Sequence, residues 1–222
     1  MKPRVLPVFG LTLLEVLRDQ DLPEEILEDE NVTVTMPRKL GLSDVIDKQI
    51  RSYRDAVKQR RRMSDDQVRD LVRLVVRRPD ARQVFAKAGA KLAGGMESAG
   101  PRGLFRALPR VVALRMARRA TSKGLRNLFG RSMGGFGQGP YALEGRGLLF
   151  HESDPSGAAC QFVTGYCQAV LSQRLGSDYQ VVHPRCQSLG DPTCRWTVTG
   201  EARVRERDGV REMLLRPEVE TG

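Results

Sequence analysis

Long apolar runs, nucleotide-binding motifs and internal repeats are absent from this 222-residue chain. No run approaches the roughly 20 apolar residues of a membrane-spanning helix. The short stretch Val5–Leu14 is interrupted by Glu15, and no small-residue cleavage site follows it, which argues against a secretory signal. The glycine-rich segment 130–139 lacks the Gly-Lys-Ser/Thr ending of a phosphate-binding loop. The sequence therefore predicts a cytoplasmic protein without such a loop.

The composition is that of a folded protein. Hydrophobic residues make up 40% of the chain and charged residues 29%, which permits a packed core and excludes wholesale disorder. The length fits one domain, or one domain with a smaller helical extension. Only four Cys are present. In the cytoplasm such cysteines are free, catalytic or metal-bound rather than paired in disulfides.

Positive charge is concentrated in one region. The formal net charge is +10, and residues 51–131 hold 22 Lys and Arg against six Asp and Glu. Residues 15–30 hold eight acids and only Arg18 as a base. This asymmetry predicts an acidic segment that faces a basic helical region, within one chain or across a homodimer. Two separately solvated faces are the alternative.

Helical periodicity is clearest in the first half of the chain, with helices predicted at about 44–62, 65–78 and 80–93. Ser43 and Ser64 precede the first two and are the expected N-caps. A helix over 6–17 and a short strand over 32–36 are also predicted. The expected core-facing stripes are Val45, Ile46, Ile50, Tyr53 and Val57 in the first helix, and Val68, Leu71, Val72, Val75 and Val76 in the second.

A basic amphipathic helix is predicted over 104–129, kinked or restarted at Pro109. Its apolar side is interpreted as facing the core while its arginines reach solvent. Such a helix can alternatively lie on an anionic membrane. The assigned apolar side consists of Leu104, Phe105, Leu108, Val111, Val112 and Met116.

The C-terminal third combines strands with one helix. Strands are predicted at 146–151, 179–183 and 194–199, and a helix is predicted from about 156 to 175, where Gly176 ends it. The charged segment after Gly200 forms either a short helix or a disordered tail.

Three of the four Cys and one His fall into the spacing Cys160-x22-His183-x2-Cys186-x7-Cys194. A hairpin would bring Cys186 and Cys194 together, and Cys160 would approach them if the preceding helix packs on the sheet. Three sulfurs and one imidazole form a complete tetrahedral set for zinc, with no position left for a catalytic water. Ordinary core positions are the alternative for each residue. Cys167 is either a core residue or a substitute ligand.

The segment 144–199, about a quarter of the chain, resembles the V4R (4-vinyl reductase) domain. The family pattern is a Cys that opens a helix, a Gly a few residues later, a strand, and then Cys-x3-Gly-x3-Cys followed by an aromatic residue. The matching positions here are Cys160, Gly165, Cys186, Gly190, Cys194 and Trp196.

The resemblance implies an α+β fold related to the trafficking-complex and nitric-oxide-signalling family, with helices packed on a small antiparallel sheet. In V4R sensor domains three Cys and one acidic residue bind a structural zinc. Cys160, Cys186 and Cys194 match the three Cys, and His183 stands where the acid is expected. An apolar ligand pocket near the metal is also implied. Its candidate lining residues, each with ordinary core packing as the alternative, are Phe105, Leu108, Val112, Phe150, Phe162, Tyr166 and Trp196.

We therefore expect a helical N-terminal region over residues 1–97, a V4R-like domain with its zinc site over 98–200, and a charged tail over 201–222. The expected function is a zinc-stabilised module that binds a small apolar, hydrocarbon or tetrapyrrole-like ligand. Such a module would act as a sensor or accessory protein, as a homodimer and through a protein partner for its output.

Other functions remain as alternatives. One is an accessory or reductase-associated protein of bacteriochlorophyll biosynthesis, and another is a dimeric scaffold like the trafficking-complex proteins. An autonomous reductase is poorly supported because no nicotinamide or flavin motif supplies a hydride. His151 and Glu152 could act as acid and base, but a solvated pair is simpler. Peripheral membrane contact through the basic helix is a further option, and nucleic acid is the least favoured partner because no recognition helix is specified.

Overall fold

The computed structural model describes residues 3–21, 44–96, 108–131, 134–176 and 179–199. Within these ranges the helices are α1 (Val8–Asp21), α3 (Asp44–Lys58), α4 (Asp65–Val76), α5 (Ala81–Met96), α6 (Arg110–Phe129) and α7 (Cys160–Leu175). The strands are β1 (Gly135–Phe136), β2 (Ala142–Gly145), β3 (Gln180–Arg185) and β4 (Cys194–Thr199). They form one antiparallel sheet in the order β1-β2-β4-β3.

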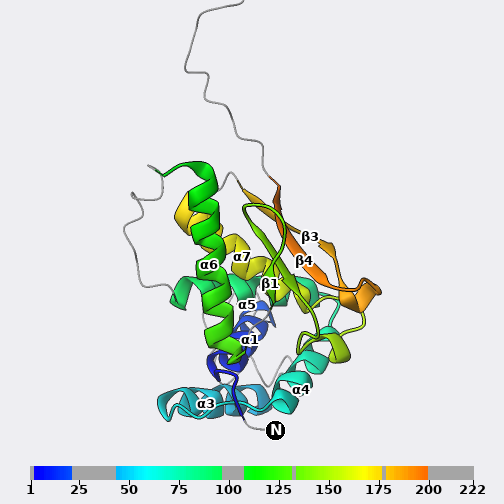
Figure 1. The fold of residues 1–222 in the computed structure, drawn as a ribbon. Coiled ribbons are helices and arrows are strands. Elements are labelled where there is room, and N and C mark those ends of the chain that lie inside the picture. The colour runs from blue at the N-terminus through cyan, green and yellow to red at the C-terminus, as the bar shows by residue number, and fades with distance from the viewer. Residues whose placement is uncertain (1–2, 22–43, 97–107, 132–133, 177–178, 200–222) are drawn as a thin grey trace, which may run out of the picture.

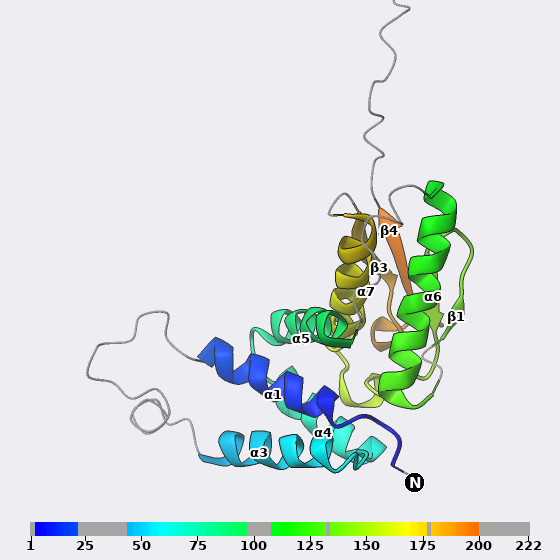
Figure 2. The same ribbon diagram turned by 90° about the vertical axis from the view of Figure 1, so that its left-hand side faces the viewer.

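The helices and the sheet are arranged in two stacked parts (Figures 1 and 2). At one end α3, α4, α1 and α5 form the helical N-terminal region. At the other end α6 and α7 lie side by side and contact β2 and β3 of the sheet, respectively. The predicted fold class is confirmed: this is an α+β protein with helices on a small antiparallel sheet, preceded by a helical region.

A cluster of four phenylalanines joins the two parts. Phe9 of α1, Phe129 of α6, Phe162 of α7 and Phe150 have ring centroids 5.1 to 6.4 Å apart. All four side chains are fully buried. The core is therefore continuous across the boundary predicted at residues 97 and 98, which itself lies outside the described residues, as does the predicted tail over 201–222.

Helices α5 and α7 approach each other through glycine. A β-carbon added to Gly165 of α7 would overlap the carbonyl oxygen of Ala86, and one added to Gly89 of α5 would overlap the carbonyl oxygen of Phe162. Because neither glycine has a side chain, the two backbones come into direct contact. Gly165 thus has a packing role in this contact.

Three predicted helices are confirmed as α3, α4 and α5, although α3 ends at Lys58, earlier than expected. In α4 the predicted stripe is buried, apart from the half-buried Val76. In α3 only part of the stripe is covered: Ile50 is buried, whereas Val45 is 53% and Val57 38% exposed. The strand predicted at 32–36 and the N-cap predicted at Ser43 lie outside the described residues.

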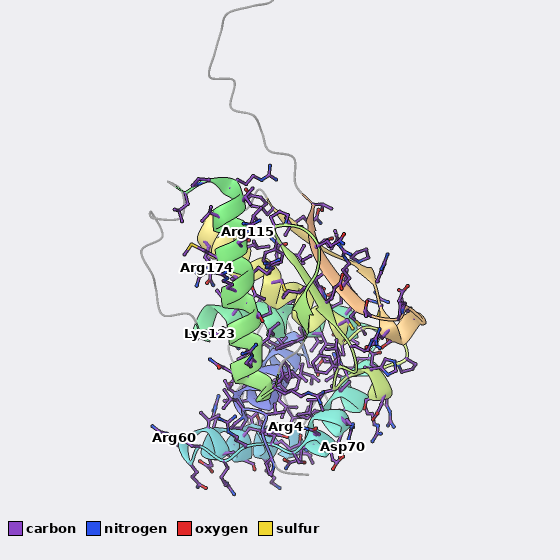
Figure 3. The ribbon with its side chains drawn as sticks, in the orientation of Figure 1. Arg4, Arg60, Asp70, Arg115, Lys123 and Arg174 are labelled. Carbon is purple, nitrogen blue, oxygen red and sulfur yellow. The ribbon has the colours of Figure 1, made fainter. Side chains whose placement is uncertain are left out.

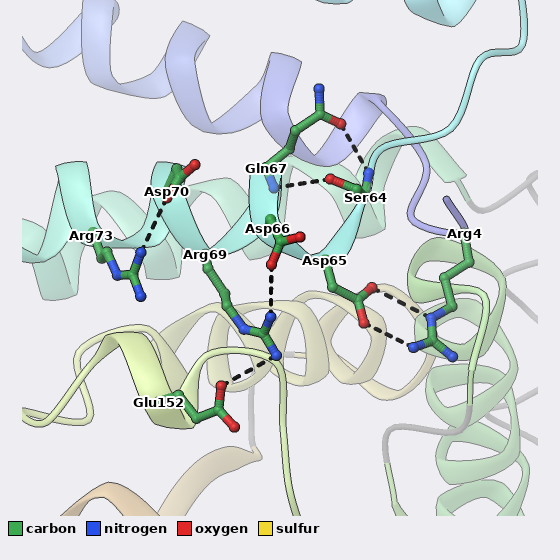
Figure 4. Close-up of polar contacts among 9 residues, drawn as sticks. All are labelled: Arg4, Ser64, Asp65, Asp66, Gln67, Arg69, Asp70, Arg73 and Glu152. Carbon is green, nitrogen blue, oxygen red and sulfur yellow. Dashed lines mark hydrogen bonds and ion pairs between the residues drawn. The ribbon is translucent and has the colours of Figure 1, made fainter. Parts of the chain in front are cut away.

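The start of α4 has a complete capping arrangement (Figure 4). Ser64 Oγ accepts a hydrogen bond from the backbone N–H of Gln67, and the Gln67 side chain accepts one from the backbone N–H of Ser64. Beside it, Arg4 pairs with the carboxylate of Asp65 at 2.8 Å. Asp65 is only 2% exposed, and the hydrogen bond from Arg4 lowers the pKa of its carboxyl group.

The Asp65–Arg4 pair makes stability depend on pH in the acid range. A carboxyl group whose pKa is lower in the folded state stabilises the fold fully above its unfolded pKa of about 3.9, and this stability is lost as the pH falls through the folded pKa. Asp65→Asn should lower the melting temperature by several degrees at pH 7. The two proteins should converge in acid, as thermal unfolding across pH would measure.

Asp66→Asn is the matched control, because it removes the same charge at the next residue, where the side chain is 75% exposed and pairs with Arg69. Exposed pairs contribute little. An equal effect of the two substitutions, or an Asp65→Asn effect that persists in acid, would contradict the assignment.

The described part of the acidic segment contacts basic helices of the same chain. Glu15 pairs with Arg54 of α3 at 3.0 Å, and Asp21 pairs with Arg78, just after α4, at 2.6 Å. The predicted charge complementarity is therefore confirmed within one chain for residues 15–21. Residues 22–30 lie outside the described ranges.

The strand predicted at 146–151 is wrong. The strand in this part of the chain is β2, which ends at Gly145. Gly147 has a φ of +61°, which turns the chain, and His151–Ser153 form a 3-10 helix. Leu148, Leu149 and Phe150 are buried in succession, whereas a strand would alternate their faces.

The apolar side predicted for the basic helix is also wrong. The helix begins at Arg110, after Pro109, and Val111, Val112 and Met116 are 49%, 42% and 38% exposed. The opposite side, which carries both small residues and leucines, packs inward. Leu108 precedes the helix and is half-buried, while Leu104 and Phe105 lie outside the described residues. The buried residues of α6 are Ala113, Leu114, Ala117, Thr121, Leu125, Leu128 and Phe129.

Candidate metal centre

Four potential metal ligands meet between α7 and the β3–β4 hairpin. One ligand atom from each of Cys160, His183, Cys186 and Cys194 lies within 4.8 Å of all the others. The sulfur of Cys160 is 3.8 Å from the sulfur of Cys194 and 3.8 Å from that of Cys186. The predicted residues are therefore brought together and are positioned to hold a metal ion.

The hairpin supplies three of the four. Cys194 is the first residue of β4, and Cys186 follows the end of β3. The strand pairing shifts between Val182 and Arg185, so that a bulge carries His183 out of the regular alternation. The Asp191 carboxylate accepts a hydrogen bond from the backbone N–H of Cys186 at 2.7 Å and closes the loop between the two cysteines.

The turn before α7 supplies the fourth ligand. Buried Asp154 accepts hydrogen bonds from the backbone N–H groups of Ser156 and Ala159, at 3.0 and 2.6 Å. These bonds hold the turn that leads into Cys160. Gly157 in this turn has a φ of +70°, and a β-carbon there would lie 2.8 Å from the sulfur of Cys186. A side chain at this position would displace a ligand atom.

Hydrogen bonding divides the charge unequally between the sulfurs. The bond shared with Cys160 is the largest cause that lowers the pKa of Cys194, to about 4, and the nearby His183 and the backbone N–H of Gln187 add to it. The same bond, followed by burial, raises the pKa of Cys160. The shared hydrogen bond therefore favours the thiolate form of Cys194, and the thiolate is the form that binds metals.

The imidazole of His183 is fixed by a ring contact. It stacks on Trp196 with a centroid separation of 4.6 Å and an interplanar angle of 12°. The indole N–H of Trp196 donates to Thr164 of α7 at 3.2 Å. Nε2 of His183 is buried and has no hydrogen-bond partner in the described part of the chain. A buried nitrogen without a partner calls for one from outside the protein, such as a bound ion or a water molecule.

The donor set fits a tetrahedral ion. Three sulfurs and one imidazole nitrogen are zinc ligands, with metal–sulfur bonds of about 2.3 Å in tetrahedral sites. Sulfurs at two corners of such a tetrahedron are about 3.8 Å apart, which is the separation of Cys160 from Cys194 and from Cys186. Little movement is needed to bind an ion of this size.

Cys167 lies outside this cluster. Its side chain is fully buried, and burial raises the pKa of its thiol to about 12. Its neighbour is the Tyr141 hydroxyl, which also forms a hydrogen bond of 3.1 Å with Thr121. Among the two roles predicted for Cys167, the core position matches its surroundings.

The residues predicted to line a ligand pocket have different surroundings. Phe150, Phe162, Tyr166 and Trp196 are at most 1% exposed, and the first two belong to the phenylalanine cluster. Val112 faces solvent, Leu108 is half-buried and Phe105 lies outside the described residues. A ligand pocket among these residues stays a prediction.

A groove of about 520 Å³ lies elsewhere, between α3 and α4. Its walls include Tyr53, Leu71 and Leu74, with Arg61 and Asp70 among its polar residues. None of the predicted ligand-lining residues borders it.

Sequence reasoning missed several residues that support the cluster. Asp154, with the Pro and Ser that follow, carries the signal of a turn closed by the Asp side chain, and Asp191 lies in the Gly-Asp-Pro loop. Gly157 carried no comparable signal, because its proximity to Cys186 depends on the tertiary fold. Trp196, which was predicted to line a ligand pocket, stacks on His183, and this contact was not predicted.

No family of proteins, curated protein or solved structure was found to match this chain. The V4R resemblance of residues 144–199 therefore stays a prediction. Across the described residues, no helix combines the length and apolar character needed to cross a membrane.

Proposed function

We propose that the chain is a zinc-stabilised binding module of the V4R type, which acts in the reducing cytoplasm as a sensor or accessory protein rather than as an enzyme. The observation that carries this proposal is the cluster of Cys160, His183, Cys186 and Cys194. When bound there, zinc supplies structural cross-linking, and its binding energy becomes folding energy.

The choice of zinc follows from the donors. Thiolates and imidazole together suit zinc, whereas calcium and magnesium prefer oxygen ligands. Four protein ligands complete the tetrahedron, so water has no position at which it could be activated. Cys160 begins α7, while His183, Cys186 and Cys194 belong to the hairpin, so the ion would fasten the hairpin to the helix.

The ligand-binding part of the proposal rests on the V4R resemblance alone. The ligand expected from it is a small apolar molecule, hydrocarbon or tetrapyrrole-like. The chain would bind this ligand as a homodimer and pass its signal to a protein partner. The metal and ligand parts are separable, so one can fail without the other.

Native mass spectrometry of the protein as purified tests both parts. We expect one zinc per chain, and a small apolar molecule that is released when the protein is denatured in organic solvent. Cobalt substitution should give the intense absorption of thiolate-to-cobalt charge transfer with tetrahedral coordination. Protein without metal that also fails to take up zinc or cobalt would overturn the metal part, and zinc-loaded protein that retains no molecule would overturn the ligand part.

A further inference from the structure

The outward side of α6 carries positive charge that no acidic side chain of the described residues pairs with. On a helix of 3.6 residues per turn, six exposed residues fall within an arc of about 100°, opposite the side that packs on the protein. Figure 3 labels two of them, Arg115 and Lys123, on the helix that stands in front of the others in that view. We call these six residues the α6 outer face: Val112, Arg115, Met116, Arg119, Lys123 and Arg126.

The four cations of this face lie together on one helix without a partner among the described residues. Within the described ranges, no hydrogen bond or ion pair engages the side chains of Arg115, Arg119, Lys123 or Arg126. By contrast, Arg54 of α3, Arg69 and Arg73 of α4 and Lys91 of α5 pair with carboxylates. The sequence has no acidic residue between Glu97 and Glu144. The face must therefore find its counter-charge outside the helix.

Repulsion between like charges affects Arg118, which lies next to the α6 outer face. Arg118 donates a hydrogen bond to the carbonyl oxygen of Gly139 at 3.1 Å. Burial first, and then repulsion from Arg115 and Arg119, lowers the pKa of Arg118. An anionic surface laid against α6 would relieve this repulsion.

The apolar members of the face distinguish among anionic partners. Val112 and Met116 are 42% and 38% exposed and lie between the cations, and Val111 at the edge is 49% exposed. A phosphate backbone gains nothing from such side chains, whereas the boundary between lipid headgroups and acyl chains accepts both cations and apolar groups. The described residues expose no large aromatic side chain here on which single-stranded bases would stack.

We propose that the α6 outer face docks on the surface of a membrane that contains anionic phospholipids. The cations would contact the headgroups while Val112 and Met116 enter the boundary with the acyl chains. The helix stands in front of the other helices in Figure 1 and lies on the side of the molecule away from α3 in Figure 2, so a flat surface can reach it. This proposal does not depend on the metal centre.

Co-sedimentation with vesicles tests it. We expect the protein to bind vesicles of phosphatidylcholine mixed with phosphatidylglycerol, to bind pure phosphatidylcholine far less, and to be released by salt. Each basic residue near an anionic surface contributes about fivefold to binding. Arg119→Gln with Lys123→Gln should thus weaken binding about 30-fold.

Two further variants make the result specific. Arg51→Gln with Lys58→Gln removes the same charge from exposed positions of α3 and should bind as the wild type does. Val112→Gln with Met116→Gln keeps every charge and should weaken binding while leaving its salt dependence. The proposal would be overturned if the two charge variants bound vesicles equally, or if the apolar variant bound as the wild type does. It would also be overturned if the protein showed no preference for anionic vesicles, or if it bound duplex DNA or acidic protein in place of vesicles.

Discussion

Cys194→Ser is expected to lose both the bound metal and much of the stability of the fold. A site filled at 1,000 times its Kd stabilises the folded state by about 4 kcal/mol, and the serine hydroxyl is a poor substitute for a thiolate in a zinc site. Denaturant unfolding should therefore show a loss of about 4 kcal/mol, with metal content falling from one ion per chain to none. A strong chelator should bring the wild type down to the stability of the variant.

Cys167→Ala is the control, because Cys167 is as buried as the ligands but lies outside the cluster. It should lose about 1 kcal/mol of packing and keep its metal and its response to chelator. If Cys194→Ser still binds one ion, or if the chelator leaves the stability of the wild type unchanged, the metal centre does not stabilise the fold as proposed.

Gly165→Ala is expected to destabilise the fold strongly. The new β-carbon would overlap the carbonyl oxygen of Ala86, and backbone cannot rotate away as a side chain can. Helices α5 and α7 would have to separate, which affects both parts of the molecule. We expect a loss of at least about 3 kcal/mol in denaturant unfolding, at the upper end of the cost of overpacking.

Gly95→Ala, in the same pair of helices, is expected to raise stability rather than lower it. Gly95 lies in α5, and a β-carbon there meets nothing within 4 Å. Alanine favours the helix over glycine by about 1 kcal/mol, so this variant should be slightly more stable than the wild type. If both substitutions destabilise alike, the loss at Gly165 reflects something other than the close approach of two backbones.

The metal cluster could be predicted because its signal is local. Cys186 and Cys194 are eight residues apart on a hairpin, and Cys160 opens the helix before it, so few assumptions bring the ligands together. The positions that shape the cluster were harder to find. Gly157 matters because its backbone faces the sulfur of Cys186, about 30 residues further along the chain, and no local pattern reports such a distance.

The errors in the fold have a common cause. In α6 the side that carries Val111, Val112 and Met116 was taken as the core side, but Ala113, Leu114 and Ala117 are buried. Both sides of the helix carry apolar residues, and the side that faces the core is set by contacts with α7 and β2, which the sequence of the helix alone does not specify. In the segment around Phe150, consecutive apolar residues suggested a strand, whereas burial on all sides in a turn produces the same run.

The phenylalanine cluster has a consequence for how the chain folds during synthesis. Phe9 leaves the ribosome long before Phe129, Phe150 and Phe162, the rings that cover it in the folded protein. The apolar surface of the N-terminal helices therefore stays exposed until α7 has emerged, and chaperones bind such surfaces. A nascent chain stalled after α5 should remain protease-sensitive, and protection should appear only once α7 has left the exit tunnel.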